Sequence, residues 1–111
     1  MKALSINFQP NRVPALDVAG VIFRLRALAA GWVEGLNVEQ GDDDGPYVNI
    51  TYTPRDLAGF WAHLRAEMDR DPIVCAALTR GSIIVCEGEH GWDDYLLLHH
   101  FDPDEPLDQL N

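Results

Sequence analysis

The C-terminal part of the chain holds its densest group of side chains that could perform chemistry. Carboxylates and imidazoles follow one another at Glu87, Glu89, His90, Asp93, Asp94, His99 and His100. Such groups bind divalent metals, and they also act as general acids and bases. A weak metal site at this last hairpin is therefore one hypothesis for the function of the chain.

The spacing of these residues argues against one shared site. His99 and His100 are neighbours in a predicted strand, where successive side chains point to opposite faces of the sheet. His90, Asp93 and Asp94 belong to the preceding turn, about 17 Å of strand away from the two histidines. We therefore predict two separate groups, an acidic turn and a histidine pair, and we assign no metal ligand and no catalytic residue.

Trp92 lies within the same turn, in the segment Gly-His-Gly-Trp-Asp-Asp. Tryptophan is enriched where binding energy concentrates, which makes this residue a candidate anchor for a partner. The alternative interpretation is structural, with the ring folded back over the edge of the sheet. The candidate binding residues of this region are His90, Trp92, Asp93, Asp94, His99 and His100.

The sequence contains none of the common catalytic motifs. G-x-S-x-G, H-E-x-x-H, the phosphate-binding P-loop and G-x-G-x-x-G are all absent. Cys75 and Cys86 form no C-x-x-C pair, and Cys86 sits in an apolar strand, where a thiol is usually inert packing. His63 and Glu67 are one helical turn apart, which predicts a surface ion pair. These observations disfavour an enzyme, and we expect no cofactor.

Patterns of apolar residues predict the elements that position these groups. The predicted strands span residues 2–9, 32–40, 47–53, 82–87 and 94–101. The first predicted helix starts at Pro14 or Asp17 and ends at Ala30, and the second spans residues 53–68. Thr53 is expected to cap the second helix, with Pro54 at its first position. Residues 73–78 fit either a strand or a helix, and Gly81 favours the helix. Residues 41–46, which include three successive aspartates, form the turn of a hairpin.

The order of these elements predicts an α+β fold. A two-layer sandwich results, with an antiparallel sheet and two helices on one of its faces. The arrangement is the ferredoxin-like β-α-β-β-α-β unit with an extra C-terminal strand. Residues 1–101 form a single domain, and residues 102–111 form an acidic, proline-containing tail.

The first helix is apolar almost all round. Phe23 lies on the side opposite its core stripe, together with several alanines. A helix of this kind is normally covered on more than one side. We expect the cover to be the C-terminal tail or a second subunit. The alternative is that Phe23 is simply exposed, since single apolar residues are common on protein surfaces. Phe23 completes the set of candidate binding residues.

Composition restricts the partners of the chain. The 111 residues carry a formal net charge of −10, and no Lys or Arg follows Arg80. This charge disfavours nucleic acids and anionic membrane surfaces, and it favours a basic partner. The apolar run from residue 13 to 33 contains Asp17, Arg24 and Arg26, so it predicts no membrane span. Two cysteines outside any disulfide framework, and the lack of a signal-peptide core, predict a cytoplasmic location.

Two functional hypotheses follow. The first is a non-enzymatic, self-associating protein–protein interaction module, expected to be a homodimer, with an inhibitor of a basic partner as one variant. The second is a small-molecule-binding protein or small enzyme with a pocket on the free face of the sheet. Its polar groups would be Tyr47, Asn49 and Thr51 with either His99 or His100.

Overall fold

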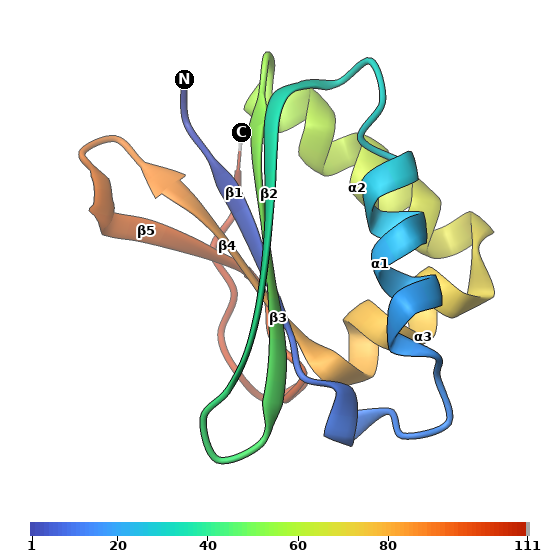
Figure 1. Cartoon of the computed structure of the whole chain (residues 1–111). Coiled ribbons are helices and arrows are strands. Elements are labelled where there is room, and N and C mark those ends of the chain that lie inside the picture. The colour runs from blue at the N-terminus through green and yellow to red at the C-terminus, as the bar shows by residue number, and fades with distance from the viewer. Residues whose placement is uncertain (111) are drawn as a thin grey trace.

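The computed structural model describes residues 1–110 of the chain. Its elements are β1 (Leu4–Phe8), the 3-10 helix η1 (Pro10–Arg12), α1 (Val18–Ala27), β2 (Val33–Asp42), β3 (Pro46–Pro54), α2 (Leu57–Arg70), α3 (Pro72–Gly81), β4 (Ser82–Gly88) and β5 (Gly91–His99). All three α-helices lie on one side of a five-stranded sheet (Figure 1). The predicted α+β class is confirmed.

The strands follow one another across the sheet in the order β2-β3-β1-β4-β5. Every neighbouring pair is antiparallel, as predicted. The sheet has the five strands that were predicted. The helical layer has three helices instead of the predicted two. The narrower ferredoxin-like arrangement is not confirmed and stays a prediction.

One face of the sheet forms the core. Alternate side chains of the central strand, Leu4, Ile6 and Phe8, are buried beneath the helices. Burying such side chains stabilises the fold by about 2 kcal/mol each. The intervening side chains lie on the face that no helix covers. We call this the open face, and it carries Ser5, Asn7, Asn49, Thr51, Ile83, Val85 and Leu97.

The predicted start of the second helix is wrong. α2 begins at Leu57, and Asp56 is its N-cap, with its backbone carbonyl accepting a hydrogen bond from the Phe60 amide. Thr53 and Pro54 instead extend β3, because both pair with the first residues of β2. Pairing between strands therefore outweighs the local capping signal.

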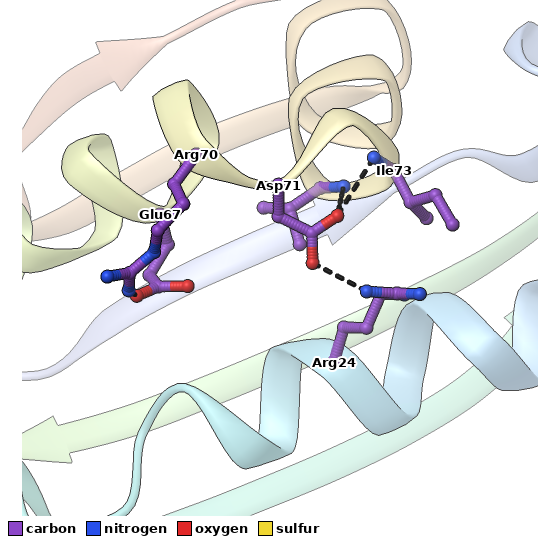
Figure 2. Close-up of polar contacts among 6 residues, drawn as sticks. Arg24, Glu67, Arg70, Asp71 and Ile73 are labelled. Atoms are coloured by element: carbon purple, nitrogen blue, oxygen red, sulfur yellow. Dashed lines mark hydrogen bonds and ion pairs between the residues drawn. The ribbon is translucent and has the colours of Figure 1, made fainter.

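Residues 73–78 lie within α3, so the favoured helical interpretation is confirmed. Asp71 precedes this helix, and its Oδ1 accepts hydrogen bonds from the amides of Ile73 (3.0 Å) and Val74 (3.4 Å). Figure 2 shows the second oxygen of the same carboxylate on the guanidinium of Arg24, at 2.7 Å. One aspartate thus caps α3 and ties it to α1. Within residues 1–110, no helix has the length and apolar character needed to cross a membrane.

The C-terminal tail follows β5. The Asp108 amide donates to the Leu97 carbonyl, and the Asp108 carboxylate accepts from the Leu97 amide, both at 2.8 Å. Leu110 packs against the core, whereas Leu107 is exposed. Phe23 of α1 remains 72% exposed, so the described part of the tail does not supply the cover expected for that helix.

Candidate functional site

Among the charged residues of the last hairpin, the structure brings His90 and Asp94 together. The His90 ring Nδ1 lies 3.1 Å from one carboxylate oxygen of Asp94, and the His90 amide donates to the other at 2.8 Å. Desolvation raises the pKa of the Asp94 carboxyl, but these hydrogen bonds lower it by more, so it lies below its ordinary value. Asp93 is exposed beside them. Residues 1–110 contain no group of three His, Cys, Asp or Glu side chains that could hold a metal ion.

His99 and His100 face different sides of the sheet, but not through the regular alternation that was expected, because β5 ends at His99 and a register shift opposite Ile84 and Val85 interrupts its pairing. The His99 Nε2 lies 3.3 Å from the Thr79 carbonyl of α3, to which it donates. His100 borders the open face, and its Nδ1 accepts a hydrogen bond from the Asp102 amide at 3.0 Å. The two rings therefore contact different parts of the structure and do not form one site.

The burial of His99 predicts a pH-dependent stability. Desolvation lowers the pKa of its imidazole below the ordinary 6.5, although the hydrogen bond to the Thr79 carbonyl raises it in part. As the pH falls below about 6.5, the unfolded chain binds a proton at this residue before the folded chain does, so stability declines. We expect His99→Gln to remove this part of the decline.

Urea unfolding at a series of pH values measures this effect. The matched control is His100→Gln, which leaves His99 in place and should keep most of the decline, because the charge of His100 contributes least to the lowered pKa of His99. An unchanged pH dependence in His99→Gln would show that this ring does not cause it.

Trp92 borders a hollow on the open face, which we call the aromatic hollow. It measures about 460 Å³ and is lined by Ile83, Val85, Trp92, Tyr95, Leu97, His100 and Glu105. Trp92 is 44% exposed and Tyr95 is 55% exposed, so the two rings stand over a base of aliphatic side chains. Two of the candidate binding residues, Trp92 and His100, therefore lie at one surface.

The sequence predicts the aliphatic base of this hollow but does not single out Tyr95. Residues 82–87 and 94–101 are apolar on both faces, which predicts apolar side chains on the open face. Ile83 and Val85 lie there and alternate with the buried Ile84 and Cys86 along β4.

Gly88 positions the hairpin that carries the two rings. It pairs with Gly91 across the turn. A Cβ atom at residue 88 would overlap the backbone carbonyl oxygen of Asp94. Glycine is therefore required for the close approach of β4 and β5 at this point.

Phe23 belongs to a different surface, a groove of about 410 Å³ on the helical layer. Its wall includes Trp32 stacked on His63, with 4.4 Å between ring centroids. The His63 Nε2 donates to the Leu28 carbonyl at 2.7 Å. The predicted ion pair of His63 with Glu67 is wrong, because Glu67 pairs with Arg70 (Figure 2). Phe23 and Trp92 thus lie on different layers and cannot serve one site.

A third surface, the polar cleft, is the largest concavity described. It measures about 750 Å³, lies between η1 and the β2–β3 turn, and is lined by Asn7, Gln9, Asn11, Arg12, Asp43, Asp44, Gly45, Pro46, Tyr47 and Asn49. Of the residues proposed for a pocket on the free face, Tyr47 and Asn49 line it. Thr51 instead lies 3.4 Å from the Ser5 hydroxyl, outside the cleft.

The described residues offer no paired nucleophile and base. Cys75 is exposed and contacts the Thr79 hydroxyl, while Cys86 is fully buried. Burial raises the pKa of the Cys86 thiol, which disfavours the reactive thiolate. Comparison with models of known protein families, with curated proteins and with solved structures gives no match. The three surfaces are therefore the candidate sites of function.

Proposed function

We propose that the protein is a non-enzymatic interaction module that forms a homodimer through the aromatic hollow. The observation that supports this proposal is the exposure of Trp92 and Tyr95 over an aliphatic base, on a face without helices. Aromatic side chains on such a base are typical of the centre of a protein–protein interface.

The charge of the chain favours a second copy at this surface. Two molecules of net charge −10 repel each other most where carboxylates are dense. Glu105 is the single carboxylate in the lining of the hollow. A two-fold axis through the hollow would stack the same apolar patch of both copies, which is the simplest closed assembly.

Sedimentation velocity over a range of protein and salt concentrations tests the proposal. We expect a monomer–dimer equilibrium that shifts toward the dimer as salt rises, because ions screen the repulsion between acidic chains. Replacing Trp92 by alanine should raise the dimer Kd about 30-fold, the effect of losing one interface hot spot.

Phe23→Ala is the matched control, since it removes an exposed aromatic ring from the helical layer and should leave the Kd unchanged. The proposal fails if the protein is monomeric throughout. It also fails if Phe23→Ala weakens the dimer while Trp92→Ala does not, because the α1 surface would then be the interface.

A basic protein partner is the second candidate, supported by the edge strand β2. Glu34 and Glu39 are exposed along this strand, and Asp42 ends it. A complex of this kind would weaken as salt rises, in contrast to the dimer. We further propose that the protein is cytoplasmic, with Cys75 and Cys86 as free thiols. We also propose that β1 to β4 and the helices between them form a ferredoxin-like unit.

A further inference from the structure

The floor of the polar cleft is a fixed chain of side-chain hydrogen bonds. Arg12 Nε donates to Gln9 Oε1 at 2.7 Å, Gln9 Nε2 donates to Asn7 Oδ1 at 2.8 Å, and Asn7 Nδ2 donates to Asn49 Oδ1 at 2.7 Å. Bonds between side chains are a minority in proteins, and ordering these side chains costs conformational entropy. These three hydrogen bonds hold the four side chains in one defined arrangement before any ligand binds.

Every bond of this chain runs in the same direction, from the guanidinium toward β3. Each amide oxygen accepts once, and each amide keeps an N–H that the chain does not use. Asn49 accepts the last bond through its Oδ1, and within residues 1–110 its side-chain amide nitrogen donates to no protein atom. The side of the cleft formed by these four side chains therefore offers hydrogen-bond donors.

The opposite wall is built by the β2–β3 turn and offers acceptors. Asp43 and Asp44 contribute carboxylates to it. A Cβ atom on Gly45 would lie 3.4 Å from the Asn11 amide nitrogen, so the turn closes against η1. A Cβ atom on Gly41 would overlap the Tyr47 hydroxyl, so this ring lies directly on the glycine. The cleft thus has a defined end and an aromatic surface.

The charges of the cleft disfavour an anion. An anion would meet Asp43 and Asp44, and the net charge of −10 would repel it over a longer range. The same charges attract a cation, which only the guanidinium of Arg12, held 3.4 Å from the centre of the Phe101 ring, opposes at close range. A neutral ligand meets neither repulsion, and calcium is therefore the charged probe that competes with it.

A ligand that spans donors on one wall and acceptors on the other needs groups that both accept and donate. Hydroxyl groups do both, and the C–H face of a sugar ring packs on an aromatic ring such as that of Tyr47. A cleft of about 750 Å³ falls in the size range of small-molecule sites. We propose that the polar cleft binds a neutral, hydroxyl-rich ligand of one or two sugar rings.

NMR titration of the ¹⁵N-labelled protein tests this proposal directly. The probes are glucose, galactose, maltose and lactose at millimolar concentrations, with glucose 6-phosphate and calcium chloride as charged comparisons. We expect at least one neutral sugar to shift the side-chain amide signals of Asn7, Gln9 and Asn49 in a saturable way. Asn49→Ala should raise the Kd of that sugar about tenfold, the effect of losing one or two hydrogen bonds.

Asn37→Ala is the matched control, because it removes the same side chain from the open face of the neighbouring strand, outside the cleft. It should leave sugar binding unchanged. The proposal is overturned if none of the four sugars shifts these signals, or if either charged probe binds there more tightly. Equal weakening by both alanine variants would also overturn it. The titration of the wild-type protein decides the question without any variant. Asn7 of the cleft pairs with Ile83 of the aromatic hollow, so the titration is run at protein concentrations on both sides of the dimer Kd to separate the two proposals.

Discussion

Replacing Phe60 by alanine is expected to lower the free energy of unfolding by about 4 kcal/mol, the largest effect of any change considered. The side chain is fully buried, where α2 meets β3. Its ring centroid lies 4.8 Å from that of Tyr52, at an interplanar angle of 57°. The Tyr52 hydroxyl donates to the Leu25 carbonyl of α1 at 2.8 Å, which holds that ring in place. Alanine would therefore leave a cavity that Tyr52 cannot fill.

Urea unfolding measures this loss as a lower midpoint with an unchanged slope. Phe23→Ala is the matched control, because that ring is 72% exposed and its removal should cost no more than about 0.5 kcal/mol. Similar losses in the two variants would mean that Phe60 does not hold the core together as the packing indicates.

The core around Phe60 was predictable because its pattern is local. Residues 57–68 place Phe60, Trp61 and Leu64 on one helical stripe, and all three are buried. The alternation of Leu4, Ile6 and Phe8 likewise predicts the buried face of β1. The periodicity of apolar residues in a helix or a strand follows from the geometry of that element alone. It can therefore be recognised without knowing which elements pack against it.

The ends of the elements were less predictable because they depend on distant partners. Thr53 and Pro54 carry a helix-start signal, yet pairing with β2 keeps them in β3. The pair Asp71-Pro72 indicates the end of a helix, because the residue before a proline avoids helical dihedrals, and α2 does end at Arg70. The pair also starts the next helix, because the Asp71 side chain accepts bonds from the first amides of α3. Residues 73–78, which follow this pair, form an apolar run that is too short for its periodicity to distinguish a strand from a helix.

The candidate sites were predictable only in part. Strand alternation predicts different faces for His99 and His100, but it would also put Leu97 and His99 on one face. The register shift opposite Ile84 and Val85 separates these two, and no local pattern indicates it. The polar cleft joins β1 and η1 to the turn between β2 and β3, and only the register of β1 on β3 sets Asn7 opposite Asn49. The spacing of residues within each strand does not predict which residue of β1 pairs with which residue of β3. The polar side chains between the core residues of β1 and β3 were the one available hint.

Replacing Asp71 by alanine is expected to lower the free energy of unfolding by about 2 kcal/mol, the second largest effect. The loss combines two functions of one carboxylate, the N-cap of α3 and the ion pair with Arg24. About 1 kcal/mol comes from the cap. The remainder comes from the bond to Arg24, whose side chain is 41% exposed and regains water.

Asp71→Asn separates the two functions, because asparagine caps a helix as well as aspartate does but carries no charge. It should cost about half as much as alanine near neutral pH. Desolvation raises the pKa of the Asp71 carboxyl, but Arg24 and the amides of Ile73 and Val74 lower it by more, so it lies below the ordinary 3.8. The advantage of aspartate is therefore complete above that ordinary value and is lost as the pH falls through the folded-state pKa.

Thermal or urea unfolding of the three proteins at neutral and acidic pH checks this prediction. Wild type and Asp71→Asn should converge in acid, while Asp71→Ala stays less stable than both. If asparagine and alanine cost the same at neutral pH, the cap contributes nothing and the ion pair with Arg24 accounts for the whole effect. If the gap between aspartate and asparagine persists in acid, the charge of Asp71 is not what ties α1 to α3.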